Sequence, residues 1–299
     1  MRRRASAVRC DSAGRAGALL SSARIIDPAF CGARREWRKL ADIEQRRGPL
    51  GGAILFALLG LGLCDAVAAS AACAPRSFDD AKFTVCAFDP RHDDIRLFLS
   101  GSDGKPYGSL AALAQALKAK GERLAFAMNA GMFKEDESPV GLYVENRQRL
   151  HEADTRAGAT NFHLKPNGVF WIGDGVAGVT ETSRYLAAPP AARDATQSGP
   201  MLVMDGKIHP KIKPGGASEK IRNGVGACDG GAVVFAISDE PVNFDTFARL
   251  FRDGLGCRNA LFLDGSVSSL YAPELNRDDE LAPIGPIVGI VRTGAAGSQ

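Results

Sequence analysis

The chain has 299 residues, of which 45% are hydrophobic and 24% are charged, and these values are ordinary for a soluble globular protein. The formal net charge of +3 is unevenly distributed. Residues 1–50 carry 12 basic and 5 acidic residues, a net charge of +7, so the remaining chain carries a net charge of −4. Because the body of the chain is mildly acidic, the composition argues against a nucleic-acid-binding surface, and no nucleic-acid partner is expected.

The first 72 residues do not have the pattern of a folded domain. Residues 1–45 are rich in Arg, Ala, Ser and Gly and show no sustained hydrophobic period, which indicates a disordered extension or a start codon assigned too far upstream. Residues 46–72 have the order of a secretory signal peptide: two arginines, an apolar core at residues 51–63, and small residues in several Ala-x-Ala frames. Because about 20 apolar residues are needed to span a bilayer, this core is too short for a stable membrane span. We therefore predict a periplasmic or secreted protein whose mature domain comprises residues 73–299.

Four cysteines follow the predicted signal peptide, and an even number is typical of disulfides in an exported protein. Four cysteines allow three pairings, of which we favour the two that are local in sequence, Cys73–Cys86 and Cys228–Cys257. A zinc site is the alternative, but the chain has no Cys-x-x-Cys and its four histidines show no paired spacing, so we expect neither a metal nor a cofactor. Lipid attachment at Cys64 or Cys73 is a weaker alternative, because the residues before each cysteine fit a lipidation signal poorly.

The mature chain is predicted to contain many short strands and few helices. Apolar runs bounded by Gly, Pro, Asn and Asp predict strands at residues 83–88, 95–99, 124–128, 141–144, 168–172, 201–204, 207–208, 232–237, 261–263 and 287–291. The first two are expected to form a hairpin across residues 89–94, and Asp205-Gly206 is a strong signal for a second hairpin.

Two segments have helical spacing. Residues 110–120 follow Ser109 as the N-cap and stop at Gly121, and residues 244–253 follow Asn243 as the N-cap. These elements predict an α+β fold of mixed, mainly antiparallel β-sheets flanked by a few helices, in a single domain without an internal linker.

Polar residues beside glycine recur where predicted strands end. The five segments are residues 129–133, 160–170, 196–200, 222–226 and 259–271. Each one alone is an ordinary turn signal, and the last is about equally well explained as an Asp-Gly turn with capping serines. Their shared position at strand ends indicates that they form one composite cleft.

These five segments, in this order, resemble the phosphodiester glycosidase family, which includes the enzyme that uncovers mannose 6-phosphate on lysosomal hydrolases. The resemblance covers roughly residues 83–290 and is closer to the bacterial exported branch than to the animal enzyme. It rests on Asn129-Ala130-Gly131-Met132-Phe133, the pairs Asn161-Phe162 and Asn167-Gly168, the turn Ser198-Gly199-Pro200, Arg222 with Gly226, and Leu263-Asp264-Gly265-Ser266-Val267-Ser268-Ser269.

The resemblance implies an exported hydrolase that cleaves the bond between a sugar and phosphate in sugar-1-phosphodiesters of envelope or extracellular glycans. Such cleavage passes through an oxocarbenium-like transition state that a carboxylate stabilises or attacks, and we assign this role to Asp264. A guanidinium fork suits the phosphate, so Arg222 is expected to bind it. Asn129 is expected to bind sugar hydroxyls or to orient Asp264.

The reaction also requires us to consider further site residues. Glu145 and Asp154 are the candidates for a second catalytic carboxylate. The residues expected to bind the substrate are Gly131, Asn161, Ser198, Gly199, Gly265, Ser268 and Ser269.

Two other functions remain open at this point. One is a non-catalytic envelope protein that binds glycans. The other is a serine hydrolase built on Ser198 or Ser268, which is disfavoured because neither serine lies in a Gly-x-Ser-x-Gly sequence.

Overall fold

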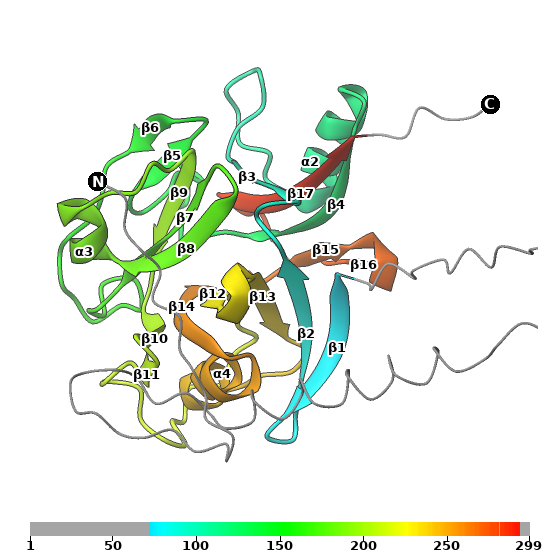
Figure 1. Cartoon of the computed structure of the whole chain (residues 1–299). Helices are drawn as coiled ribbons and strands as arrows, with labels where there is room; N and C mark the ends of the chain where they lie inside the picture. The colour runs from blue at the N-terminus through cyan, green and yellow to red at the C-terminus, as the bar shows by residue number, and fades with distance from the viewer. Residues whose placement is uncertain (1–71, 281, 294–299) are drawn as a thin grey trace, which may run out of the picture. The chain divides into compact units, whose positions relative to one another are not determined.

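Three antiparallel β-sheets and a few short helices make up the structure, a computed structural model that describes residues 72–280 and 282–293 (Figure 1). The strand pairings among these residues are antiparallel. The predicted α+β class, with mainly antiparallel sheets and few helices in one domain, is confirmed. The predicted extension and nearly all of the predicted signal peptide lie outside the described residues.

The largest sheet has seven strands in the order β1-β2-β13-β12-β14-β10-β11. Strand β13 is buried at every position, as its run of apolar residues predicts for a strand that is covered on both faces. The strands of this sheet are β1 (Cys73–Phe78), β2 (Ala81–Phe88), β10 (Met201–Met204), β11 (Lys207–Ile208), β12 (Asn223–Cys228), β13 (Val233–Ser238) and β14 (Cys257–Asp264).

The other two sheets have five strands each. The first has the order β16-β15-β4-β17-β3 and consists of β3 (Asp94–Phe98), β4 (Glu122–Asn129), β15 (Leu270–Ala272), β16 (Arg277–Asp278) and β17 (Ile287–Thr293). The second has the order β6-β5-β9-β7-β8 and consists of β5 (Tyr143–Glu145), β6 (Gln148–His151), β7 (Gly168–Gly173), β8 (Val176–Glu181) and β9 (Asp194–Ser198).

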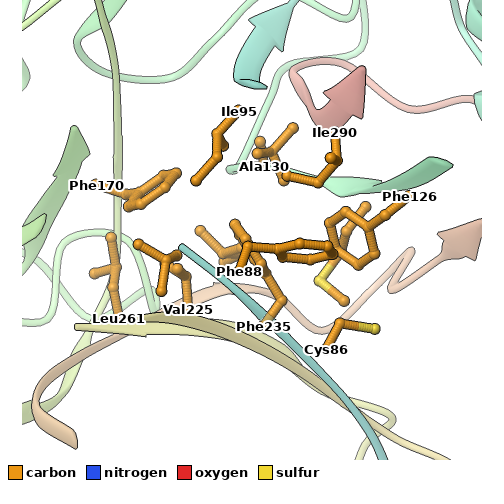
Figure 2. Packing of buried hydrophobic residues seen from close by; sticks show 14 of the residues in the cluster. Cys86, Phe88, Ile95, Phe126, Ala130, Phe170, Val225, Phe235, Leu261 and Ile290 are labelled. Carbon is orange, nitrogen blue, oxygen red and sulfur yellow. The ribbon is translucent and has the colours of Figure 1, made fainter. Parts of the chain in front are cut away.

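The three sheets share one hydrophobic core, in which aromatic rings from each sheet meet (Figure 2). The ring of Phe235 on β13 lies 5.1 Å from Phe126 on β4 and 5.7 Å from Phe170 on β7, measured between ring centroids. Phe88 on β2 lies 4.9 Å from Phe126. Because one aromatic cluster contacts all three sheets, it fixes how the strand ends of different sheets meet.

Helices cover the other faces of the sheets. Helix α2 (Leu110–Ala119) packs beside β4 and β17, and α3 (Thr182–Ala187) packs beside β7 and β8. Helix α4 (Phe244–Arg249) continues into a π-helical turn, Leu250–Gly254, and packs on the seven-stranded sheet. Two short 3₁₀ turns, Asp229–Gly231 and Pro273–Leu275, complete the described helices.

Both predicted N-caps are present. The side chain of Ser109 accepts a hydrogen bond from the backbone N–H of Ala112, and that of Asn243 accepts one from Thr246. Gly121 follows α2 with a φ of +75°, a left-handed conformation that favours glycine and ends the helix.

The predicted hairpin across residues 89–94 is wrong, although both of its strands exist. Strand β2 pairs with β1 and β13, whereas β3 pairs with β17 in another sheet. The connection is therefore a crossover between sheets. Two apolar runs separated by turn-forming residues give the same local signal in either case, and only the packing of the shared core distinguishes them. The hairpin of β10 and β11 is confirmed.

The structure contains both predicted disulfides. Cys73–Cys86 joins β1 to β2, and Cys228–Cys257 joins β12 to β14. Within the described part of the chain, we found no helix long and apolar enough to cross a membrane.

We expect the Cys228–Cys257 bridge to contribute substantially to stability. It joins residues 29 positions apart, and replacing both cysteines by Ser is expected to lower the free energy of unfolding by about 3–4 kcal/mol through the gain in unfolded-chain entropy. Urea denaturation measures this change. The Cys73→Ser, Cys86→Ser variant serves as the comparison and should lose somewhat less, because its loop spans 13 positions. An unchanged unfolding midpoint for the first variant would contradict the expectation.

Candidate functional site

A cavity of about 600 Å³ is lined by residues from four of the five segments singled out in the sequence. Met132 and Phe133 come from the first segment, Thr160 to His163 from the second, Arg222 from the fourth, and Asp264 to Val267 from the fifth. The third segment, residues 196–200, does not line this cavity. The structure therefore brings Asp264, Arg222, Asn161 and Gly265 together around one space.

Asp264 is the last residue of β14, and its carboxylate is held by the turn that follows. Its Oδ1 accepts hydrogen bonds from the backbone N–H groups of Gly265 at 2.5 Å and Ser266 at 2.7 Å. Its Oδ2 has no hydrogen-bond partner among the residues that the structure describes. Only 7% of the residue is exposed. One carboxylate oxygen is thus anchored, and the other is free to interact with a ligand.

Burial raises the pKa of the Asp264 carboxyl above its ordinary value. The backbone N–H groups of Ser266, Gly265 and Val267 lower this pKa and offset part of the increase. The carboxylate is therefore weakly solvated, and a cation that approached it would be attracted more strongly than in water.

A buried pair of amide side chains holds the strand ends behind Asp264. The Asn223 Nδ2 donates to the backbone oxygen of Asn129 at 3.0 Å and to its Oδ1 at 2.8 Å. The Asn223 Oδ1 accepts from the backbone N–H of Asp264 at 2.9 Å. Both asparagines are fully buried, so they join β4, β12 and β14 without contact with solvent.

The predicted site serines support this arrangement and do not line the cavity. The Ser268 Oγ donates to the backbone oxygen of Asp264 at 2.8 Å, and the Ser269 N–H donates to the Asn129 Oδ1 at 2.9 Å. The Ser198 Oγ, on β9, donates to the backbone oxygen of Leu263 at 2.8 Å. Each of these serines is buried.

The hydrogen bonds of the Asn129 side chain define which of its amide atoms is the oxygen. Its Oδ1 accepts from two donors, so its Nδ2 cannot exchange places with the oxygen. This Nδ2 is buried and has no hydrogen-bond partner among the described residues. An unpaired buried donor costs about 1–3 kcal/mol, and a catalytic role is one of the explanations for such a group in a native structure.

Arg222 is a buried cation without a carboxylate partner among the described residues. Its Nε donates to the Val242 oxygen at 2.8 Å and its Nη2 to the Ser218 oxygen at 2.7 Å, while the guanidinium carbon lies 3.7 Å from the ring centroid of Phe244. Burial lowers the pKa of Arg222 to about 10, so it stays charged at neutral pH. A positive charge that is desolvated, stacked and unpaired in a cavity wall is well suited to bind an anion.

The predicted glycines have packing roles. A β-carbon on Gly131 would lie 2.9 Å from the Thr196 Oγ1, and one on Gly199 would lie 2.7 Å from the Asn167 Cβ. One on Gly265 would lie 2.9 Å from the ring of Phe262. These glycines let backbone segments pack closely, and only Gly265 also lines the cavity.

Asp154 reaches the cavity only through His163. The His163 Nε2 lies 3.2 Å from the Asp154 Oδ2, and its Nδ1 lies 2.8 Å from the Thr160 Oγ1. The Arg156 side chain also binds Asp154 and holds the pKa of that carboxyl well below its usual range. His163 and Thr160 line the cavity, whereas Asp154 does not, so Asp154 is not placed as a second catalytic carboxylate there.

Glu145 is not brought to this cavity. It is the last residue of β5 and lines a separate pocket of about 360 Å³ with Arg96, Tyr107 and Arg193. Its Oε2 accepts a hydrogen bond from the Tyr143 hydroxyl at 2.8 Å, and burial raises its pKa. Strand β5 lies in the second five-stranded sheet, whereas Asp264 ends a strand of the seven-stranded sheet.

Sequence reasoning missed Asn223 as a site residue. It stands in the segment at residues 222–226, but an amide beside glycine reads as a turn. Its position at the start of a buried strand, opposite Asp264 in the register of β12 and β14, appears only in the fold. Among the described residues, no group of three or more His, Cys, Asp or Glu is arranged to hold a metal ion.

The chain belongs to the phosphodiester glycosidase family, because a sequence profile of that family matches residues 122–291. The Escherichia coli K12 protein YigE, which is uncharacterized, is 35% identical over 197 residues, covering 65% of this chain and 77% of YigE. The catalytic domain of zebrafish N-acetylglucosamine-1-phosphodiester alpha-N-acetylglucosaminidase, auto-inhibited by its pro-peptide, has a TM-score of 0.51 at 16% identity. That alignment covers 73% of this chain and 81% of the zebrafish chain, and it shows a similar fold.

The raised pKa of Asp264 has a consequence for stability. The native state binds a proton at this carboxyl more tightly than the unfolded state, whose pKa is about 3.9. Ionisation of Asp264 therefore costs stability above the folded-state pKa, and the cost disappears as the pH falls toward about 4.

Asp264→Asn should consequently melt at the same temperature as the wild type or higher at neutral pH, because Asn keeps an oxygen that accepts from Gly265 and Ser266 and removes the buried charge. The difference should shrink as the pH is lowered from about 8 to about 4 in thermal denaturation experiments. A variant that melts well below the wild type at neutral pH would show that the fold stabilises the ionised form.

Proposed function

We propose that the protein is an exported hydrolase that cleaves the sugar–phosphate bond of sugar-1-phosphodiesters. Membership of the phosphodiester glycosidase family supports the reaction class. The observation that carries the proposal is that Asp264, with one free carboxylate oxygen, and Arg222, with no carboxylate partner among the described residues, line the same cavity.

Asp264 is the carboxylate that acts at the anomeric carbon. As the bond to phosphate breaks, positive charge develops on the sugar ring, and a fixed carboxylate in a poorly solvated site stabilises or attacks that centre. Two backbone N–H groups hold the Oδ1, so the free Oδ2 keeps a defined position relative to the sugar. Little protonation of the leaving group is required, because the departing phosphate monoester is already a good leaving group. Water then supplies the new hydroxyl group of the released sugar.

Arg222 holds the phosphate. Neither Asp264 nor Arg222 forms a salt bridge with the other or with another described residue, so the two charges are available to two parts of one substrate. The stacking on Phe244 and the two carbonyl contacts fix the plane of the guanidinium. Asn161, on the exposed rim of the cavity, is placed to contact the sugar or the group beyond the phosphate.

Export is part of the proposal. The two disulfides are typical of proteins that fold in an oxidising compartment, and the predicted signal peptide at residues 46–72 agrees with them. The glycan of the cell envelope or of the medium would then be the source of the substrate.

A serine hydrolase is disfavoured by the contacts of the two candidate nucleophiles. The Ser198 Oγ donates to the oxygen of Leu263 and the Ser268 Oγ to that of Asp264. Both side chains are buried, and neither lines the cavity. A glycan-binding protein without turnover is the remaining alternative, which the following experiment distinguishes.

The proposal is tested with a panel of aryl- and nucleotide-linked sugar-1-phosphodiesters. Wild-type protein is expected to hydrolyse at least one member, and Asp264→Asn should reduce kcat by about a thousandfold, equivalent to about 4 kcal/mol, because the charge that stabilises the transition state is removed. Released sugar and phosphate ester are measured directly. If Asp264→Asn retains activity within about tenfold of the wild type, or if the wild type only binds the panel, the glycan-binding alternative replaces the proposal.

Arg222→Lys tests the phosphate site. Lys keeps a positive charge but loses the planar fork, the stacking on Phe244 and the contacts with two carbonyl oxygens. We expect kcat/KM to fall by about 100-fold and the free energy of unfolding to fall by about 1–3 kcal/mol, because the carbonyls lose their donors.

The readout that separates the two effects is inhibition by inorganic phosphate, measured well below the melting temperature. Weaker inhibition in Arg222→Lys than in the wild type indicates a direct contact with phosphate. Equal inhibition with reduced stability would show that Arg222 has only a structural role.

A further inference from the structure

The register between β12 and β14 shifts at the end of β14, next to Asp264. Asn223 lies opposite Asp264, whereas the next residue, Gly224, lies opposite Phe262. One residue of β14, Leu263, is therefore extra relative to β12. Extra residues of this kind bend a strand and redirect the side chains beside them, and they are frequent next to active sites.

The side chain of Asn223 replaces the ladder contact that the register shift removes. Its Oδ1 accepts from the N–H of Asp264 at 2.9 Å. Its Nδ2 makes both contacts with Asn129, on a strand of a different sheet. Asn223 is 0% exposed, so no substrate group reaches it directly.

The extra residue is held from the opposite side. The Ser198 Oγ, at the end of β9 in the third sheet, donates to the oxygen of Leu263 at 2.8 Å. The peptide group that joins Leu263 to Asp264 is thus bound at its oxygen by Ser198 and at its N–H by Asn223, two side chains from different strands. Asp264 takes its position from all three sheets through these contacts.

We propose that Asn223 is a positioning residue that holds the register shift at Leu263 and thereby directs the Asp264 carboxylate into the cavity. Ser198, which binds the Leu263 oxygen, has the same role. The inference rests on the proposed function for its kinetic consequence. A displacement of about 1 Å in a catalytic group can reduce turnover by about 100-fold without changing what the site binds. Loss of Asn223 should accordingly affect kcat more than KM.

The test compares Asn223→Ala with Leu117→Ala, a control in the core between α2 and its sheet, where Leu117 is 2% exposed. Both variants should melt below the wild type. Asn223→Ala should lose about 100-fold in kcat with KM within about threefold of the wild type, whereas Leu117→Ala should keep its kcat below its melting temperature.

Hydrogen–deuterium exchange provides a readout that does not depend on activity. The segment at residues 263–269 should take up deuterium faster in Asn223→Ala than in the wild type, because the N–H of Asp264 loses its acceptor. Leu117→Ala should leave exchange in this segment unchanged. If Asn223→Ala does not fold, Ser198→Ala is the second variant, and it should show the same pattern with a smaller loss of kcat.

The outcomes separate this inference from the proposed function. An Asn223→Ala protein with kcat within about threefold of the wild type, or with unchanged exchange at residues 263–269, overturns the positioning role even if Asp264→Asn is inactive. If wild-type protein hydrolyses no member of the panel, the proposed function fails. The exchange comparison still decides whether Asn223 holds the segment that carries Asp264.

Discussion

The buried hydrogen bonds at the end of β14 are the contacts on which the site depends. Asn223 and Asn129 bind each other, Asn223 binds the backbone of Asp264, and Ser198 binds the residue before it. These side chains come from strands of three different sheets, which meet around the Phe235 cluster (Figure 2). The aromatic core brings the strand ends close together. The hydrogen bonds of Asn129 and Asn223 then hold the backbone of Asp264 in one position, which defines where its carboxylate lies.

The buried charged groups of the site lower the stability of the folded state. Burial raises the pKa of Asp264 and lowers that of Arg222, which means that each group would be better solvated in the unfolded chain. Neither forms a salt bridge among the described residues, and the Asn129 Nδ2 has no partner there. A protein that only needed stability would pair or replace these groups, and their retention is typical of sites where stability is exchanged for function.

The sequence was most informative about local structure and least informative about how distant segments meet. The caps at Ser109 and Asn243, the turn at residues 205–206 and the disulfides follow from short-range rules, and the structure contains all of them. The crossover after β2 could not be distinguished from a hairpin, because both need the same turn-forming residues. The roles of Ser198 and Asn223 could not be predicted for a similar reason. In the sequence, a polar residue beside glycine looks the same whether its side chain binds a ligand or a buried backbone group.

The positions of Asp264 and Arg222 also indicate how one substrate can interact with both charged side chains. A phosphodiester carries one negative charge, and Arg222 offers one unpaired positive charge in the cavity wall. Binding the phosphate there would neutralise the guanidinium, so that Arg222 no longer offsets the negative charge of Asp264 before positive charge develops on the sugar. The carboxylate would then interact more strongly with the transition state than with the bound substrate, which is the condition for catalysis rather than for tight binding. On the proposed function, the absence of a salt bridge between the two side chains is therefore what allows the carboxylate to act.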